Sequence, residues 1–410
     1  MGLPLALALT EHLGGVMLVS AAIAFYIASR AASDAMSQPG ATSPIRHALA
    51  QWGGIAAVCL VSVWLNHAEI AVGVIFSTSV AALSLHLGVA IATSPQPARA
   101  RREGHGFEVV PSHESSIAAS PHDEAQHFEV GVRGRRGWAM VLPVGVLALM
   151  AGFSGKLTLL HALLFAIQGL FVLMVWKPRT GEPAPTASAG RLSGTARAQL
   201  ALAIVLAVIG AFCAIYGAVR MSEETGIMST GLIASAALGP LLILPMIGSA
   251  SLMAAHGQVQ TVAGASVVMV LLNLCLLLPL VIVGWHLREQ YFVPPTTPEA
   301  LAAPVTRPTT NAATKPATGP TTATATSTRP SDEDIPEDFA DEVAIPDDMP
   351  RVLSFPIAVW RIDTVLLILL GLVLLPVALN LWDLRRSEGI LLVAVYACYL
   401  IGTTFLGRRW

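Results

Sequence analysis

Long apolar runs dominate the chain, and most are close to the length that a helix needs to cross a membrane. A spanning helix takes about 20 consecutive, mostly apolar residues. Such runs lie near residues 5–30, 46–65, 69–93, 138–153, 157–176, 198–220, 226–255, 259–284, 363–382 and 389–407. The fourth and fifth runs are short, and the residues between them, Gly152–Lys156, predict a tight helical hairpin. The pattern predicts an all-α integral membrane protein with ten transmembrane helices.

Three polar segments separate groups of these runs. Residues 94–137 contain six arginines and four histidines, and residues 177–197 form a Pro/Ala/Gly linker. Residues 285–362 combine a Thr/Pro/Ala tract with an acidic block from Asp332 to Asp348. Because the tract is repetitive and low in apolar residues, it cannot bury a core, and we expect this loop to be disordered.

Basic residues predict the orientation. With the N-terminus outside, the inner loops hold 14 of the 24 Lys and Arg residues, whereas the short outer loops hold only Lys156 and Arg220. Basic residues in short loops favour the cytoplasmic side. We therefore expect both termini and the loop 285–362 to lie outside, with the bacterial inner (plasma) membrane as the location.

The loop lengths divide the predicted spans into two matched halves. The long loop of the first half joins spans 3 and 4, and that of the second half joins spans 8 and 9. Five spans per half make the halves enter the membrane in opposite senses, which is typical of inverted-topology repeats in secondary transporters. The predicted organisation is a first repeat at 1–176, a cytoplasmic linker at 177–197 and a second repeat at 198–410.

The composition agrees with a lipid-facing protein. Charged residues make up 12% of the chain, about half of the roughly 25% usual in soluble proteins. The net charge of −2 gives nucleic acid no reason to bind. The four cysteines lie inside apolar runs, where thiols are small packing groups and not a disulfide framework or a metal site. We find no nucleophile elbow, phosphate loop or metal-ligand motif, so we expect neither an enzyme nor a bound cofactor.

The last run carries the first resemblance to a known family. Arg386-Ser-Glu388-Gly389 leads into a helix in which Tyr396 and Tyr399 have Y-x-x-Y spacing. This resembles the closing helix of the cation/calcium exchanger superfamily, and the segment Glu224-Thr-Gly226-Ile resembles the start of that family's second half. The resemblance implies cation antiport by alternating access, with spans 2–3 and 7–8 as two central α-repeats.

The acidic ion site of that family is missing from this sequence. In the exchangers, each α-repeat carries a P-E turn, and the two glutamates bind a hard cation at the membrane midplane. Here the resemblance puts Gly54-Ile55 and Pro245-Met246 at those turns. No Asp or Glu occurs between Thr225 and Arg288. We therefore expect that calcium does not bind in the family's manner, while sodium, potassium and protons stay open as partners.

A small set of polar or kink-forming residues remains as candidates for an ion pathway. They are Ser77, Thr78, Ser79, Pro245, Ser266, Asn273 and Glu11. Small hydroxyl groups also let membrane helices approach closely, which is the competing interpretation for the serines and the threonine. Asn273 is the sharper candidate, because an amide buried in lipid needs partners. His86 and His161 are ionisable groups within apolar runs, and the histidines of residues 94–137 belong either to a transition-metal site or to a solvated loop.

Two functions stay open at this point. The first is a secondary membrane transporter of the sodium/calcium exchanger type that has lost the acidic ion site. The second is a non-transporting exchanger scaffold that acts as a structural or partner-binding membrane protein. Membrane lipid is a partner in both cases, and the sequence identifies no protein partner.

Overall fold

The computed structural model describes most of the apolar runs and few of the polar segments. The described residues are 13–36, 44–95, 132–176, 193–226, 228–292, 353–354, 357–379, 381 and 384–407. Glu11, the histidines of residues 96–131 and the Thr/Pro/acidic tract at 294–350 lie outside them. The chain divides into two compact units, one formed by residues 1–289 and 352–410 and the other by residues 290–351.

The described part of the chain is almost entirely helical. The α-helices are α2 (Leu13–Met36), α3 (Pro44–Trp64), α4 (Ala68–Ala81), α5 (Leu87–Thr93), α6 (Val132–Ala151), α7 (Leu159–Trp176), α8 (Gly194–Thr225), α9 (Thr230–Ile233), α10 (Gly239–Ala255), α11 (Val259–Leu272), α12 (Leu278–Phe292), α13 (Ile357–Ala378) and α14 (Arg386–Gly407). Three π-helical turns, η1 (Ala82–His86), η3 (Ala234–Leu238) and η4 (Asn273–Leu277), continue their neighbouring helices, and η2 (Gly152–Ser154) is a 3-10 turn. Two short strands, β1 (Lys156–Leu157) and β2 (Leu353–Ser354), pair antiparallel.

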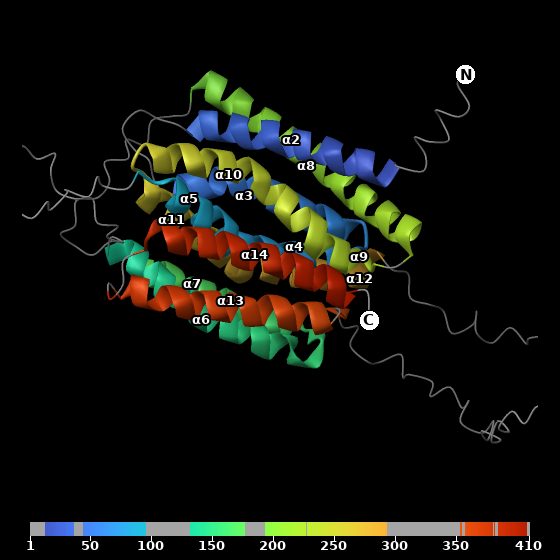
Figure 1. Cartoon of the computed structure of the whole chain (residues 1–410). Coiled ribbons are helices and arrows are strands. Elements are labelled where there is room, and N and C mark those ends of the chain that lie inside the picture. The colour runs from blue at the N-terminus through green and yellow to red at the C-terminus, as the bar shows by residue number, and fades with distance from the viewer. Residues whose placement is uncertain are drawn as a thin grey trace, which may run out of the picture. The chain divides into compact units, whose positions relative to one another are not determined.

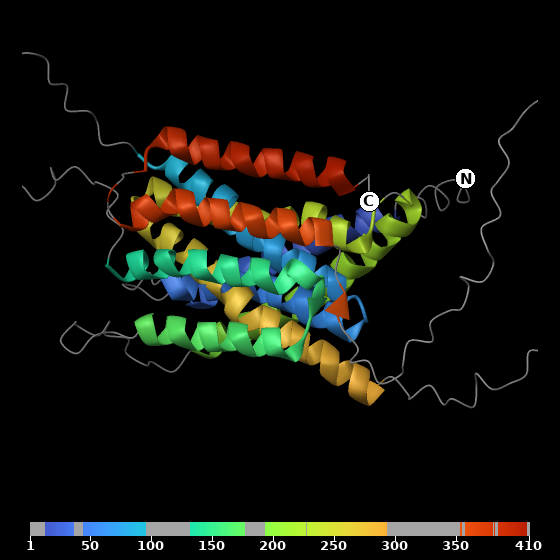
Figure 2. The same ribbon diagram turned by 90° about the horizontal axis from the view of Figure 1, so that it is seen from below.

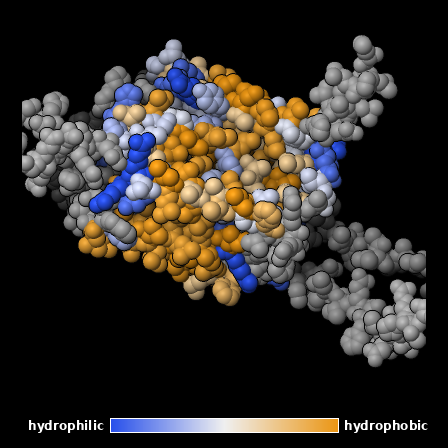
Figure 3. Space-filling view, viewed as in Figure 1, coloured by the Kyte–Doolittle hydropathy of each residue, from blue (hydrophilic) through white to orange (hydrophobic). Residues whose placement is uncertain are grey.

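Length and apolar character make this an all-α membrane protein. Among the described residues, eight helices or continuous helical stretches are long and apolar enough to cross a membrane. Two shorter apolar helices, Gly137–Ala151 and Leu159–Met174, lie where the sequence predicted the fourth and fifth spans. Apolar side chains cover most of the surface seen in Figure 3, as expected of a protein whose sides face lipid.

The most buried of the long stretches is Ala68–Thr93, which joins α4, η1 and α5. It is 94% buried in its most apolar window, whereas the window in α2 is only 28% buried. It packs against α3, α10, α11, α13 and α14. Its buried polar side chains, which include Thr78, Ser79 and His86, therefore face other helices. Figure 1 shows α2 and α8 at one edge of the bundle and α6 and α13 at the other.

Glycines allow the backbones of neighbouring helices to approach closely. A Cβ added at Gly217 of α8 would lie 2.9 Å from the Gly14 carbonyl oxygen of α2, and one at Gly389 of α14 would lie 2.7 Å from the Gly88 carbonyl oxygen of α5. Small residues let membrane helices pack backbone to backbone. Figures 1 and 2 both show α13 alongside α6, where Gly145 contacts Ile368 and Gly371 contacts Leu142.

Two segments of the core repeat the same backbone irregularities. Asn66 and Gly257, both with positive φ, follow α3 and α10. A π-helical turn comes next in each segment, beginning at Ala82 in η1 and at Asn273 in η4. The interval in residue number from Asn66 to Ala82 equals the interval from Gly257 to Asn273. One constant offset in residue number, which we call the repeat offset, therefore relates both pairs of positions.

The packing of this core repeats with the same offset. A Cβ on Gly73 of α4 would meet Ser235 of η3, and one on Gly264 of α11 would meet Pro44 of α3. The repeat offset relates Pro44 to Ser235 and Gly73 to Gly264, so the two contacts are reciprocal. The two segments thus share both their irregular turns and the contacts that hold them together.

Candidate functional site

Asn273 is the centre of a buried polar network. It is the first residue of η4 and has no exposed surface. Its side-chain Oδ1 accepts a hydrogen bond of 3.0 Å from the indole Nε1 of Trp52 on α3. Its Nδ2 donates to Thr78 Oγ1 at 3.0 Å and to Ser79 Oγ at 3.2 Å, both on α4. The amide therefore connects three segments that are distant in sequence, and we call these four residues the asparagine network.

The hydroxyl groups of this network have fixed roles. Thr78 Oγ1 donates to the Val74 carbonyl oxygen and Ser79 Oγ donates to the Ile75 carbonyl oxygen, each at 2.6 Å. Since each hydroxyl has one proton, both must accept from Asn273. Every donor of the amide is then used inside the protein, so the network is complete without a ligand. These hydrogen bonds hold η4 against α3 and α4, and in this sense the amide acts as a clamp between the segments.

Ser77 and Pro245 lie outside the asparagine network. Ser77 Oγ donates to the Val74 carbonyl oxygen at 3.3 Å, and a Cβ added at Gly239 of α10 would approach Ser77 Oγ to 2.2 Å. Ser77 is thus a close-packing residue at the crossing of α4 and α10. Pro245 lines a mainly apolar cavity of about 290 Å³ between α2, α3, α8 and α10.

The two positions that the resemblance assigns to the exchanger glutamates hold buried apolar side chains. Ile55 is 0% exposed and Met246 is 1% exposed. The repeat offset relates these two residues as well, so they occupy equivalent places in α3 and α10. No oxygen from these two side chains is available to a cation, because isoleucine and methionine have none.

One buried carboxylate escaped the sequence analysis. Among the described residues, Asp363 of α13 is the only acidic residue in the buried class. Tyr399 of α14 donates a hydrogen bond of 2.8 Å to Asp363 Oδ1. The second carboxylate oxygen and the Tyr396 hydroxyl have no hydrogen-bond partner among the described residues. The signal in the sequence was weak, because Asp363 is the first residue of the predicted run 363–382 and looks like part of a helix end.

A second polar group lies at the end of the bundle where α3 and α11 begin and α5 and α10 end. It consists of His47 and Gln51 of α3, His86 of η1, Ser249 of α10 and Ser266 of α11, and we call it the histidine cluster. His86 Nδ1 and Ser266 Oγ are 2.8 Å apart, so Ser266 contacts this cluster and not Asn273. The sequence had suggested that Ser266 and Asn273 line one pathway, but the described contacts put them in different networks.

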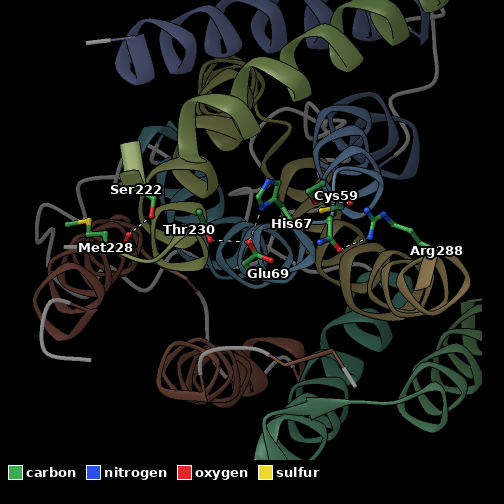
Figure 4. A network of polar contacts seen from close by, with 9 residues as sticks. Cys59, His67, Glu69, Ser222, Met228, Thr230 and Arg288 are labelled. Atoms are coloured by element: carbon green, nitrogen blue, oxygen red, sulfur yellow. Dashed lines mark hydrogen bonds and ion pairs between the residues drawn. The ribbon is translucent and has the colours of Figure 1, made fainter. Parts of the chain in front are cut away.

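The opposite end of the core holds the one acidic residue of the first α-repeat. Glu69, in the first turn of α4, accepts a hydrogen bond of 3.0 Å from Thr230 of α9 and lies 3.2 Å from His67 Nδ1 (Figure 4). Nearby, Arg288 of α12 donates to Asn66 Oδ1 at 2.6 Å, which fixes the turn after α3. These contacts lie at helix ends and tie the two central segments together.

The described residues contain no group of three or more His, Cys, Asp or Glu side chains arranged to hold a metal ion. His161 lies at the start of α7, where its Nδ1 is 3.1 Å from the Thr158 backbone nitrogen and 3.1 Å from its hydroxyl oxygen. It therefore caps a local turn and has no contact with either polar network.

Comparison with known proteins reveals the fold. No protein-family model and no curated protein sequence matches the chain. The structure of an H⁺/Ca²⁺ exchanger, CAX, is similar with a TM-score of 0.58 and 12% identity, over 98% of this chain and 85% of that one. The structure of native YfkE gives 0.58 and 11%, over 98% and 97%. The sodium-calcium exchanger NCX_Mj gives 0.50 and 12%, over 96% and 97%. The chain therefore has the fold of the cation/calcium exchanger superfamily, which confirms the resemblance at the level of the fold.

Proposed function

We propose that this protein is a secondary transporter that exchanges inorganic cations by alternating access of two halves. The observation that carries the proposal is the similarity to CAX, an H⁺/Ca²⁺ exchanger, which extends over 98% of this chain. A fold alone does not specify a function. In this case, the two central segments related by the repeat offset, which meet at the asparagine network, support the proposal.

The proposed architecture is ten spans in two inverted repeats, at 1–176 and 198–410, with 177–197 as the linker. The eight long helical stretches together with α6 and α7 supply ten. The repeat offset shared by matched turns and contacts supports two related halves. In addition, α2 begins and α14 ends at the same end of the bundle, as an even number of crossings requires (Figures 1 and 2).

The proposed transporter does not use the acidic calcium site of the exchangers. Dehydrating a divalent ion in a low-dielectric interior requires compensating charge, which Ile55 and Met246 cannot supply. Hydroxyl, amide and carbonyl oxygens can suffice for monovalent ions. The proposed pathway therefore follows Thr78, Ser79 and Asn273, and the expected cargo is sodium, potassium or a proton.

The alternative is a non-transporting scaffold in which the same fold serves packing or partner binding. The completed hydrogen bonds of Asn273 favour it, because the described partners already use every donor of the amide. The two proposals differ in one measurable respect, since only a transporter dissipates an ion gradient.

Reconstitution into proteoliposomes tests the proposal. Vesicles would be loaded with sodium, potassium or buffer of a different pH, and uptake of calcium-45, sodium and potassium would be followed against protein-free vesicles. We expect exchange of a monovalent cation and no sodium-driven calcium uptake. Robust sodium-dependent calcium uptake would contradict the lost site, and the absence of any flux would favour the scaffold.

The proposed orientation has both termini outside a bacterial plasma membrane, based on the 14 basic residues assigned to the inner loops against two in the short outer loops. A protease added to intact spheroplasts should then cut within 294–350. Cleavage that requires lysis of the cells would reverse the orientation.

A further inference from the structure

The histidine cluster has buried hydrogen-bonding atoms that nothing in the described part of the protein occupies. His86 is 0% exposed and Gln51 is 3% exposed. His86 Nε2 and Gln51 Oε1 have no hydrogen-bond partner among the described residues. A polar atom that is buried without a partner destabilises the folded state, because it has lost its hydrogen bonds to water. Two such atoms in one cluster indicate a site that binds something in part of the protein's working cycle.

The neighbouring contacts bear on the form of His86. Ser266 Oγ lies 3.1 Å from the Val262 carbonyl oxygen and 2.8 Å from His86 Nδ1, and its single proton can serve only one of them. When the hydroxyl donates to the carbonyl oxygen, the imidazole donates to the hydroxyl from Nδ1. A neutral His86 in this arrangement has its proton on Nδ1, and the unpaired Nε2 carries a free lone pair.

The same reasoning applies to Gln51. Ser249 Oγ donates to the Met246 carbonyl oxygen at 2.8 Å, so it accepts the hydrogen bond of 2.7 Å from Gln51 Nε2. The second proton of this nitrogen points to His47 Nε2 at 3.0 Å. Both donors of the Gln51 amide are used, and its free atom Oε1 is an acceptor. The two unpaired atoms of the cluster are therefore both acceptors, which suits a positively charged ligand.

The charges around His86 limit what that ligand can be. The ring centroid of His47 is 6.4 Å from that of His86. Of the elements packed against η1, α5, α10 and α11 contain no acidic or basic residue. Glu69 is at the other end of α4, and α14 has Arg386 and Glu388 in its first turn. The other titratable groups of α14 are Cys398, Tyr396 and Tyr399, and the two tyrosines lie close to Asp363. The other titratable groups of α3 are Arg46 and Cys59.

We propose that His86 Nε2 is the site at which this antiporter takes up its coupling proton, with His47 and Gln51 as the neutral groups that share the charge. This inference rests on the proposed function. A metal dication would bring two charges to a cluster without a carboxylate, at a high cost in an apolar interior. A proton brings one charge and forms a covalent N–H bond, and imidazole is the side chain whose protonation changes between pH 5 and 8.

The position of the cluster suggests how uptake and release alternate. Gln51 also lines the cavity of about 290 Å³ between α2, α3, α8 and α10, so separation of these helices would bring water to the cluster. In that hydrated state, Nε2 takes a proton from hydronium, giving imidazolium and water. When these helices close and the cluster opens to water on the other side of the membrane, the imidazolium gives its proton to that water, and His86 returns to the neutral form that a dry interior favours.

The test uses the full-length protein with ¹⁵N-labelled histidines in lipid nanodiscs, together with the variant His86→Gln. The His86 signals are those lost in the variant. We expect a neutral imidazole protonated on Nδ1 at about pH 8, and at about pH 5 we expect imidazolium signals from the molecules in which the helices have separated and water reaches the ring. Signals that stay neutral throughout this range would overturn the proposal. So would signals that shift on stoichiometric addition of zinc and not with pH, because the site would then be a metal site.

Flux measurements provide the second arm. A pH-sensitive dye inside proteoliposomes reports proton movement against an imposed sodium or potassium gradient. In His86→Gln, proton counterflow should fall by about 100-fold, the loss expected when a proton-transfer group is removed. His286→Gln is the matched control, since His286 is a part-buried histidine of α12 whose ring contacts only its own helix in the bonds described. It should retain the counterflow within about twofold.

The two arms separate the proposals. Cation exchange without proton counterflow would overturn the proton site and leave the proposed transporter intact. Absence of every cation flux would overturn the transporter, while the histidine signals would still decide whether His86 binds a proton.

Discussion

The two central segments of this protein have the same backbone design but different polar chemistry. The first runs from α3 to α5 and the second from α9 to α12, and the repeat offset matches their positive-φ turns and their π-helical turns. The first segment contains the buried His86 and Gln51, whereas the second contains the buried Asn273. The equivalent of Asn273 in the first segment is Ala82, and the equivalent of His86 in the second is Leu277. Turn geometry and close packing are therefore kept where side-chain chemistry is not, because packing constrains size more than polarity.

The largest effect should come from a position where the matched segments differ in whether they tolerate an added methyl group. Gly239 packs onto Ser77, while the equivalent position in the first segment is Ala48, which packs near Val268. Gly239→Ala puts a Cβ about 2.2 Å from Ser77 Oγ, so the two helices must separate. We expect a loss of about 2–3 kcal/mol in the free energy of unfolding, measured in mixed micelles.

Gly248→Ala is the control on the same helix, since nothing lies within 4 Å of the added Cβ. It should be neutral or slightly stabilising because alanine favours helix. Equal stability of the two variants would show that the close approach at Gly239 does not limit the packing of α10.

The next largest effect concerns the asparagine network. Asn273→Ala removes three hydrogen bonds and leaves the Trp52 indole and two hydroxyl groups with fewer partners. We expect a loss of about 2 kcal/mol in the free energy of unfolding. The matched control is Ser84→Ala, because the Ser84 hydroxyl donates only to the Val80 carbonyl oxygen of its own helix and should cost less than about 1 kcal/mol. If Asn273→Ala were no more harmful than Ser84→Ala, the amide would not act as a clamp between the segments.

A smaller effect is expected where α13 meets α14. Tyr399→Phe removes the hydroxyl that donates to Asp363 and should cost about 1 kcal/mol in the free energy of unfolding. Tyr396→Phe removes a buried hydroxyl without a hydrogen-bond partner in the described residues and should be close to neutral. Thermal unfolding of the two variants side by side measures the difference, and a reversed order would mean that Asp363 is held by other contacts.

The smallest effect is expected from adding acidic residues at the two positions where the resemblance places the exchanger glutamates. Ile55→Glu combined with Met246→Glu restores one carboxylate to each segment, next to Gly54 and Pro245. We expect weak calcium binding with a Kd of about 1 mM, because the remaining ligands are neutral and already hydrogen-bonded. Ile55→Gln with Met246→Gln is the matched uncharged control. Calcium binding by the control, or by the unmodified protein, would contradict the assignment of these two positions.

Much of the fold could be predicted from hydrophobic pattern alone. Apolar runs identified the regions of the long helices, since a lipid environment requires long apolar segments whatever their neighbours are. The boundaries were less accurate. The first helix was expected at 5–30, and the described helix covers Leu13–Met36. The fourth run was expected at 138–153, and its helix is Val132–Ala151. The fifth was expected at 157–176, and its helix is Leu159–Trp176.

The polar centre could be predicted only as a set of candidates. Asn273, Thr78 and Ser79 were identified because an amide or hydroxyl in lipid needs a partner, and the structure brings these three together. Ser266 belongs to the same set of candidates, and its hydroxyl contacts His86 and not Asn273. Asp363 was missed because it stands at the first residue of a predicted run, where an acid looks like part of a helix end.

The sequence by itself determined that the chain is an all-α membrane protein and that no Asp or Glu lies between Thr225 and Arg288. These are properties of composition and spacing along one helix, and they need no knowledge of neighbours. Only the tertiary structure decided which polar groups meet, because residues 52, 78 and 273 come together through the packing of helices that are far apart in the chain. It also decided which buried polar atoms have no hydrogen-bond partner among the described residues. Gln51 Oε1 and His86 Nε2 are unpaired, whereas the other side-chain nitrogens of these two residues contact Ser249, His47 and Ser266.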